Sequence, residues 1–433
     1  MKQMKNRKVM LGIIVLTAIC GCRSVRTHES ILKEQISGLD KLGNVMVITR
    51  EDGSGTRSTF SQLTGFDEKN KETGASDLTR TDAETADSAS LVLETIAHWK
   101  VKGLRICNHS SERCVRQGIC ISAKSEGITA GIEISDCEIF EVDGENRRAM
   151  PVYQSMYWNG AVYVTFPGRT SAQDHLHDII ISNNYIHDVR TSGISVNQQE
   201  DFINDIHHTH VVVRGNRIER TGSDGIIVAN CISPLIDSNV CFDAGALGTL
   251  EDTQLIAGIW VCATRDALIQ RNEVARTRMF ENDGTAFDTD WGTAGTTVFQ
   301  YNYSHDNEGG FWLDCMKLNH NRDCEKTILR YNISMRDGRG IAVYDQGILT
   351  EWYGNLFFHE KLIQICCFDE GENFHFDHNV FCIPQETDWQ KARYEENIVN
   401  DSQWLELIQY ETQNPNWRDH VTEKLCKFVG VTI

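Results

Sequence analysis

The sequence predicts a mainly β protein in which most of the chain is wound as a parallel β-helix, preceded by a small α/β segment. The first observation behind this prediction is an Asn that repeatedly opens a run of alternating residues. Its copies are spaced by 32, 23, 33, 30, 30, 23 and 24 residues, at Asn184, Asn216, Asn239, Asn272, Asn302, Asn332, Asn355 and Asn379. Constant short segments at unequal spacings indicate coils with fixed strands and variable loops. We expect these Asn residues to occupy left-handed turns and to hydrogen-bond their copies on adjacent coils.

The second observation is a set of short strands that each begin with Gly, at positions 118, 193, 225, 258, 284, 310 and 340. Alternation within each run has the period of a strand and not of a helix. The side chains expected to point into the core are Ile194, Val196, Ile226, Val228, Ile259, Val261, Phe287, Trp312, Ile341 and Val343. A leucine-rich horseshoe would need a Leu lattice, which is absent, and a propeller needs about 40–45 residues per blade. The parallel β-helix, with about nine or ten coils, is therefore favoured.

Residues 101–385 resemble the right-handed parallel β-helix repeat proteins, the fold shared by pectate lyases, polygalacturonases and many bacterial polysaccharide-degrading enzymes. The segment 283–315 is similar to a stretch that recurs in secreted bacterial β-helix proteins of carbohydrate breakdown, and it reads DGTAFDTDWGTAGTTVFQYNYSHDNEGGFWLDC. The resemblance implies a right-handed solenoid that acts on polysaccharide or oligosaccharide. The polygalacturonase signatures NTD, DD, GHG and RIK are missing, and fold alone does not define an activity.

The candidate catalytic residues are Asp288, Asp290 and Asp314, which lie just beyond the inward positions of two successive Gly-led strands. Corresponding residues of adjacent coils lie ~4.8 Å apart, so we expect Asp288 or Asp290 to neighbour Asp314. Two carboxylates at ~5 Å suit a retaining glycosidase, and ~6.5–9.5 Å suits an inverting one. Like charges at that distance also raise one pKa, which yields an acid beside a base. A glycosidase is favoured over a lyase.

Aromatic residues interleaved with these carboxylates suit the C–H face of a sugar. The predicted substrate contacts are Trp291, Trp312, Trp260, His305, Glu308 and Arg278. Three alternatives stay open for the acidic cluster: turn capping, a Ca²⁺ site built from carboxylate oxygens, and pairing with Arg276 or Arg278 in a non-catalytic carbohydrate-binding protein. No other metal or cofactor is expected.

Residues 1–22 have the pattern of an export leader, with Lys and Arg before the apolar run VMLGIIVLTAI. The run ends in ICGC, which resembles a bacterial lipobox with Cys22 as the lipid acceptor. An uncleaved anchor is the alternative, and both place the chain outside the cytoplasm. The remaining 13 of the 15 cysteines include several in apolar strands, where a thiol acts as a small buried hydrophobe. Free thiols better suit a reducing compartment, which conflicts with export.

Residues 23–97 contain an anion-binding pattern, TREDGSGTRS at 49–58, in which glycines and hydroxyls precede a predicted helix. The pattern resembles one lobe of the phosphate-binding proteins of ABC importers, whose helix is matched here by TADSASLVLETIA at 85–97. The resemblance implies phosphate contacts from Arg50, Ser54, Gly55 and Thr56. No opposing lobe is identifiable, so we expect little or no high-affinity phosphate binding. The abrupt change near residue 98 indicates a fusion or a misjoined reading frame.

The predicted organisation is a leader, a binding-protein fragment, a β-helix and a polar helical cap over the open end, at 1–22, 23–97, 98–385 and 386–433. The sequence has 61 acidic and 42 basic residues, a formal net charge of −19, which argues against a nucleic-acid partner. A hydrophobic content of 40% is typical of a soluble globular protein. We expect a monomer that meets the membrane only through its lipid anchor.

Overall fold

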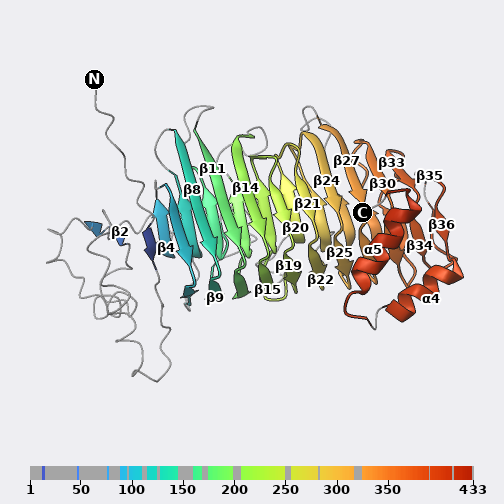
Figure 1. Cartoon of the computed structure of the whole chain (residues 1–433), viewed down its shortest axis with the longest axis horizontal. Helices are drawn as coiled ribbons and strands as arrows, with labels where there is room; N and C mark the ends of the chain where they lie inside the picture. The colour runs from blue at the N-terminus through green and yellow to red at the C-terminus, as the bar shows by residue number, and fades with distance from the viewer. Residues whose placement is uncertain are drawn as a thin grey trace.

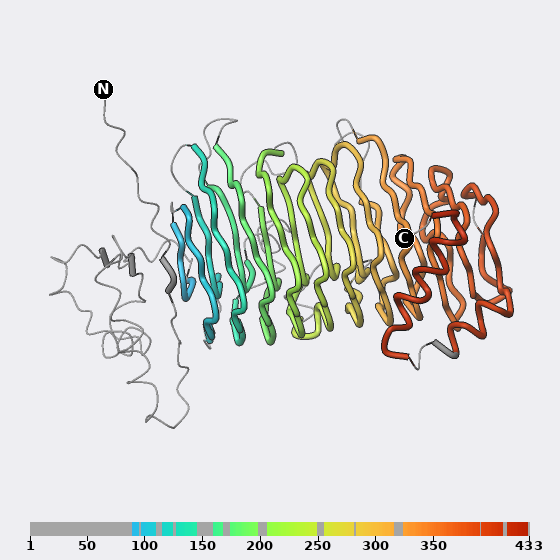
Figure 2. Tube along the Cα trace, in the orientation of Figure 1, coloured from blue at the N-terminus to red at the C-terminus, as the bar shows by residue number. Residues whose placement is uncertain are grey.

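The computed structural model describes residues 12–14, 46–47, 76–77, 88–94, 97–109, 115–123, 127–144, 159–167, 174–197, 206–248, 255–280, 283–315, 324–389, 391–411 and 414–431. Their strands form three long parallel sheets that run side by side along the molecule (Figure 1). Neighbouring strands within a sheet come from successive turns of the chain, so a coil typically contributes one strand to each sheet (Figure 2), although one coil contributes two short strands to the first sheet. The predicted fold class, a parallel β-helix, is confirmed.

Sheet 1 has 13 strands: β1 Gly12–Ile14, β5 Trp99–Lys102, β8 Ile128–Ser135, β11 His175–Ser182, β14 His208–Arg214, β17 Cys231–Ile232, β18 Leu235–Asp237, β21 Leu268–Gln270, β24 Gly295–Gln300, β27 Cys324–Arg330, β30 Thr350–Tyr353, β33 Phe374–Asp377 and β35 Arg393–Glu395.

Sheet 2 has 11 strands: β6 Arg105–Asn108, β9 Glu138–Val142, β12 Tyr185–Val189, β15 Arg217–Thr221, β19 Val240–Phe242, β22 Glu273–Ala275, β25 Tyr303–His305, β28 Ile333–Met335, β31 Leu356–Phe358, β34 Val380–Cys382 and β36 Ile398–Val399.

Sheet 3 has 10 strands: β4 Ser88–Glu94, β7 Arg116–Ser122, β10 Val162–Thr165, β13 Ile194–Asn197, β16 Ile226–Ala229, β20 Ala257–Cys262, β23 Thr285–Thr289, β26 Gly310–Asp314, β29 Gly340–Val343 and β32 Gln364–Cys367. A separate pair joins β2 Met46–Val47 to β3 Ser76–Asp77.

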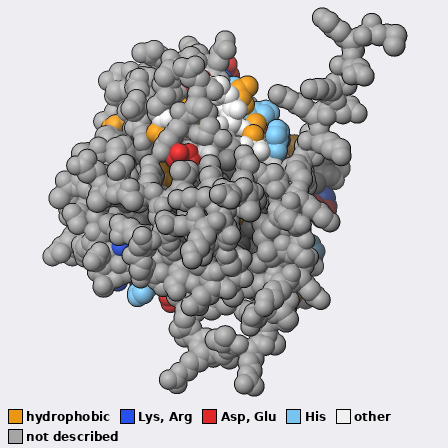
Figure 3. Space-filling view, turned by 90° about the vertical axis from the view of Figure 1, so that its left-hand side faces the viewer, with side chains coloured by type: hydrophobic (Ala, Val, Ile, Leu, Met, Phe, Trp, Pro, Cys, Tyr) orange, Lys and Arg blue, Asp and Glu red, His pale blue; other side chains and the backbone are white. Residues whose placement is uncertain are grey.

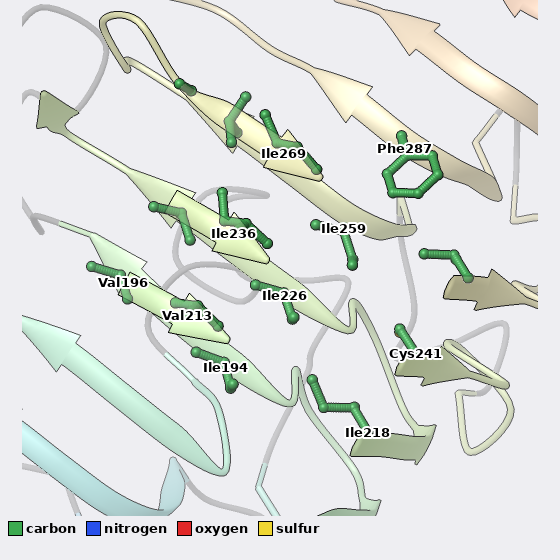
Figure 4. Close-up of a cluster of buried hydrophobic side chains, with 14 of the residues drawn as sticks. Ile194, Val196, Val213, Ile218, Ile226, Ile236, Cys241, Ile259, Ile269 and Phe287 are labelled. Atoms are coloured by element: carbon green, nitrogen blue, oxygen red, sulfur yellow. The ribbon is translucent and has the colours of Figure 1, made fainter. Parts of the chain in front are cut away.

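The core is one column of aliphatic and aromatic side chains enclosed by the three sheets. In Figure 4, Ile226 and Ile259 of sheet 3 point toward Ile236 of sheet 1 and Cys241 of sheet 2. The inward positions predicted from alternation are confirmed with one exception, because Val343 packs on the outer face of sheet 3. Alternation of inward and outward residues therefore operates along most of the solenoid.

The eight repeated Asn residues form a continuous buried ladder, as predicted. At one step, Asn216 donates from its backbone N–H and its amide to Asn239 Oδ1, both at 3.0 Å, and Asn239 donates to Val213 O at 2.9 Å. The left-handed residue is the one before each Asn and not the Asn itself, as at Ser238 (φ 56°) and Tyr301 (φ 57°). The ladder thereby satisfies polar groups that would be costly to bury unpaired.

The first strand of sheet 3, β4, lies where a helix was predicted, so that prediction is wrong. Its Leu91 and Leu93 pair in register with Ile119 and Ile121 of β7. Pairing with an apolar strand outweighs the weak helix propensity of this segment, and the solenoid begins before residue 98. β1, within the predicted leader, pairs with β5. The lipidation residue Cys22 and the phosphate contacts Arg50, Ser54, Gly55 and Thr56 lie outside the described residues.

The predicted C-terminal helices are present as α4 Ser402–Glu411 and α5 Trp417–Phe428. Their apolar residues pack with the outward side chains of sheet 2, and this second cluster comprises Ile333, Met335, Leu356, Val380, Cys382, Trp404, Ile408, Val421 and Leu425. The helices therefore cover the side of the last coils and not the open end, where the cap was predicted (Figure 1). No described helix is both long and apolar enough to cross a bilayer.

The twelve described cysteines are free thiols, and most of them are buried. Burial raises the pKa of Cys231 and of Cys241, since an apolar surrounding disfavours the thiolate. Their predicted behaviour as small core hydrophobes is confirmed.

On the side of the molecule seen in Figure 3, described histidine and hydrophobic side chains lie together near the top of the view.

Candidate active site

Strand β23 places an acidic cluster on the outer face of sheet 3. Asp288 lies in register with Trp260 of β20 and Leu313 of β26. Its neighbours in the chain, Phe287 and Thr289, align with core residues of the preceding strand, so Asp288 points outward.

The carboxyl group of Asp288 is buried and incompletely paired. The residue is 6% exposed, and its Oδ1 has no hydrogen-bond partner. Burial raises the pKa of Asp288 well above its ordinary value, and the charges of Asp290 and Asp283 add to the effect. Asp288 is therefore a carboxyl group that holds its proton at a pH where an ordinary Asp is ionised.

Two less buried carboxyl groups flank Asp288 in the chain. Asp290 follows β23, and its Oδ1 accepts the backbone N–H of Trp291 at 2.6 Å. Asp283 precedes β23 and is joined to it by Gly284, whose φ is +106°. A Cβ on Gly284 would lie 2.6 Å from Met279 Cα, so this close turn requires glycine. The turn keeps Asp283 close enough to raise the pKa of Asp288.

A fourth carboxyl group, Asp224, was missed by the sequence analysis. It is fully buried and accepts hydrogen bonds from Trp260 Nε1 (2.9 Å), Ala257 N (2.9 Å) and Ser223 Oγ (2.8 Å). Burial raises the pKa of Asp224 to about 6. The available signal was the dipeptide Asp-Gly, which opens the strand after Asp224 as it opens the strand after Asp283.

We expected Asp288 or Asp290 to lie in register with Asp314, and this is wrong, because Asp288 aligns with Leu313 and the partner of Asp314 is Thr289, which lies between the two aspartates. Asp314 aligns with Thr289, one position further, and by alternation it faces the opposite side of the sheet. It is fully buried, and its Oδ2 accepts the backbone N–H of Gln346 at 3.2 Å. It contributes to the raised pKa of Asp288 less than Asp290 and Asp283 do.

Two of the three predicted tryptophan contacts are buried and present no face to a substrate. Trp312 lies in the core, donates to Thr289 Oγ1 at 3.2 Å and packs edge-on against Trp352. Trp260 is on the outer face but is 2% exposed and bonded to Asp224. Trp291 is half-buried beside Asp290 and stays a candidate contact. Packing thus competes with ligand binding for large aromatic residues.

The remaining predicted contacts do not join the cluster. His305 is on sheet 2, hydrogen-bonded to Asp306 (2.7 Å) and Glu273 (3.4 Å) and stacked on Tyr303. Burial lowers the pKa of His305, but the bonds to these carboxylates outweigh it and raise the pKa overall.

Two arginine pairs bear on one of the open alternatives. Arg278 bonds to Glu308 at 2.7 Å, and Arg276 forms a two-point bond with Asp243 at 2.8 and 2.7 Å. These bonds engage Asp243 and Glu308, whereas the pairing that would favour a non-catalytic binding protein is with Asp288, Asp290 or Asp314. Within the described ranges, no group of three or more His, Cys, Asp or Glu side chains is arranged to hold a metal ion.

The chain is thus a parallel β-helix with carboxyl groups clustered on the outer face of one sheet, and known proteins were found that are similar to it. No family model matches the chain. Over 314 residues the chain is 26% identical to the lacto-N-biosidase of Bifidobacterium longum subsp. longum, which covers 63% of this chain and 19% of that protein.

Solved structures share the β-helix fold. The crystal structure of the GH136 lacto-N-biosidase from Eubacterium ramulus matches with a TM-score of 0.51 and 22% identity, over 72% of this chain and 51% of that one. Its selenomethionine derivative matches with a TM-score of 0.52, over 74% and 53%. The chain thus spans about a fifth of the curated relative and about half of the solved one. This structural likeness supports the β-helix fold.

Proposed function

We propose that this chain hydrolyses a glycosidic bond of an oligosaccharide, with the carboxyl groups around β23 as its acid and base. The observation that carries the proposal is the buried Asp288 carboxyl group, which has an unpartnered oxygen and lies among other carboxyl groups. Glycosidases need one carboxyl group that keeps its proton beside another that is ionised. A buried carboxyl with a raised pKa next to half-buried ones meets this requirement.

In the proposed reaction, Asp288 gives its proton to the leaving glycosidic oxygen. Asp290 either accepts a proton from the attacking water or attacks the anomeric carbon itself. Asp290 is favoured over Asp283 for this second role because its charge raises the pKa of Asp288 more than the charge of Asp283 does. Trp291, adjacent to Asp290, is the proposed aromatic contact for the sugar ring.

The name of the curated relative suggests the first substrate to try. A lacto-N-biosidase acts on a lacto-N-bioside, so we propose an oligosaccharide with a terminal lacto-N-biose unit as the substrate of this chain. A panel of other oligosaccharides and polysaccharides tests the broader class.

The test uses the full chain, the variants Asp288→Asn and Asp290→Asn, and the control Asp243→Asn. General acid–base catalysis contributes typically ~10²–10⁴-fold, so each site variant is expected to lose activity on that scale. Asp243 lies on the turn after sheet 2 and pairs with Arg276, so its variant is expected to stay active. Full activity in both site variants would remove the proposal. A loss in Asp283→Asn but not in Asp290→Asn would instead transfer the second role to Asp283.

Attachment to the bacterial membrane through a lipid on Cys22 and a location outside the cytoplasm stay predictions. Labelling with a radioactive fatty acid is expected for the chain and not for Cys22→Ser. Phosphate binding through residues 50–56 stays equally a prediction of weak or absent affinity, and isothermal titration with phosphate tests it.

A further inference from the structure

Several strands of sheet 3 are followed directly by a residue with a left-handed backbone, but the residue types differ along the solenoid. At the earlier coils these residues are Asn230 (φ 61°) and Ala263 (φ 47°). At the later coils they are Tyr344 (φ 62°) and Phe368 (φ 77°). The backbone pattern is shared, since Asn230 N donates to Cys262 O and Tyr344 N donates to Cys367 O. An aromatic residue is less favourable than Asn in this conformation, which Tyr301 and Tyr331 also adopt before ladder asparagines.

The two aromatic rings lie together on the face that carries Asp288. Tyr344 and Phe368 stack with centroids 5.1 Å apart and an angle of 26° between the rings. Tyr344 is half-buried against an outer-face cluster that contains Leu313, the register partner of Asp288. Phe368 is 56% exposed, among the largest exposed fractions of the described large hydrophobic residues. The turn after β32 thus presents the Phe368 ring to solvent.

Arg339 connects the aromatic pair to the acidic cluster. Arg339 immediately precedes β29, at the end of the strand opposite to Tyr344. Its Nε donates a hydrogen bond to Gly309 O at 2.9 Å, and its guanidinium carbon lies 5.4 Å from the centroid of the Phe368 ring. The Phe368 ring therefore lies back over the sheet. Burial lowers the pKa of Arg339, and Asp283 is among the groups that oppose this, which places the arginine near both features.

We propose that Tyr344 and Phe368 form an aromatic subsite that binds a neutral sugar ring of the substrate at a distance from the bond cleaved near Asp288. This inference rests on the proposed function. The aromatic residues follow strands that lie two and three positions beyond β23 in sheet 3. At ~4.8 Å per strand the separation is ~10–14 Å, more than one sugar ring, so the subsite selects oligosaccharides of roughly three or more units. An aromatic face stacks on the C–H face of a pyranose.

The test compares Phe368→Asn with Trp389→Ala. Asn is chosen because it occupies the equivalent turn at position 230, so the variant keeps the backbone and loses only the ring. Trp389 is also an exposed aromatic residue (38%), but it packs on Phe381 and Tyr394 and lies outside the proposed subsite. Thermal unfolding of each variant checks that it folds.

Binding is measured by isothermal titration in an Asp288→Asn background, with lacto-N-biose-terminated and cello-, xylo- and chito-oligosaccharides from disaccharide to hexasaccharide. Phe368→Asn is expected to weaken binding of the longer ligands about tenfold, with a smaller effect on disaccharides, and Phe368→Trp is expected to restore it. Equal effects of Phe368→Asn and Trp389→Ala, or a loss that ignores ligand length, would overturn the subsite. If Asp288→Asn proves fully active while the length-dependent loss persists, the catalytic proposal fails and the subsite stands.

Discussion

The asparagine ladder and the carboxyl groups around β23 are both buried polar arrays within the same solenoid, and they differ in how their atoms are satisfied. Asn239 makes four side-chain hydrogen bonds, and each step of the ladder repeats the pattern. Asp288, at a comparable depth, keeps an oxygen without a partner. A polar group that is fully paired stabilises a fold, whereas one left unpaired lowers stability and is available to a ligand. The asparagine ladder therefore has a structural role, whereas the carboxyl group of Asp288 is a candidate for binding and catalysis.

The largest effect on activity is expected from replacing the unpaired carboxyl group with an aliphatic side chain, Asp288→Val. Its register partner Leu313 shows that an aliphatic side chain fits this face. Hydrolysis is expected to fall at least ~100-fold because the proton donor is gone. The free energy of unfolding is expected to rise by about 1–3 kcal/mol because a buried polar atom without a partner is removed. Activity assays and urea unfolding measure the two quantities, and an active but destabilised variant would refute the contrast.

Replacing a polar side chain of the asparagine ladder with an aliphatic one is expected to lower the free energy of unfolding, not to raise it. Asn239→Ala removes the acceptor of both Asn216 donors and leaves them buried and unpaired. We expect a loss of about 3–5 kcal/mol in the free energy of unfolding, from several unpaired groups together. The neighbouring surface variant Ser238→Ala is the control, expected within about 0.5 kcal/mol. Equal losses would mean that the ladder is not a source of stability.

The smallest effect concerns Asp224, which lies between these two cases because it is fully hydrogen-bonded yet buried. Its pKa of about 6 is raised above the ordinary 3.8, so its contribution to stability is fully present below pH 4 and is lost as the pH rises through 6. Asp224→Asn keeps the acceptor for Trp260 and removes the charge. The variant is expected to be more stable than the parent at pH 7, by at most about 3 kcal/mol, and equal to it near pH 4.

Urea unfolding of both proteins across this pH range measures the effect. A difference that does not change with pH would show that Asp224 does not titrate in the folded protein.

The fold was predictable from the sequence because each coil repeats the same two signals. The Asn ladder and the Gly-led strands recur many times, so errors at single positions do not change the conclusion. The neighbour of Asp288 was not predictable in the same way. Gly284 precedes β23 and Gly310 is the first residue of β26, so Thr285 and not Gly284 aligns with Gly310. A shift of one residue moves a side chain to the other face, and alignment on glycines cannot detect it.

Other parts of the site depended on packing that the sequence does not encode locally. Trp260 and Trp312 are aromatic residues of the kind that stack on sugar rings, but neighbouring side chains bury both of them. Asp224 lies two strands away from Asp288 in sheet 3, and its link through Trp260 needs the stacked register. Residues 88–94 form the strand β4 because they pair with β7, a strand that comes later in the chain. The local sequence of this segment does not reveal that pairing, and it was therefore predicted as a helix.

The spacing of the ladder has a consequence for how this molecule can lengthen. Its steps of 23 and 24 residues still complete the hydrogen-bond pattern, so a coil of that size stacks on its neighbours without interrupting the ladder. Duplicating the coil between Asn355 and Asn379 should extend the rod by one strand spacing, ~4.8 Å, without altering the neighbourhood of Asp288. Evolution can therefore adjust the reach of the rod and the chemistry of β23 independently.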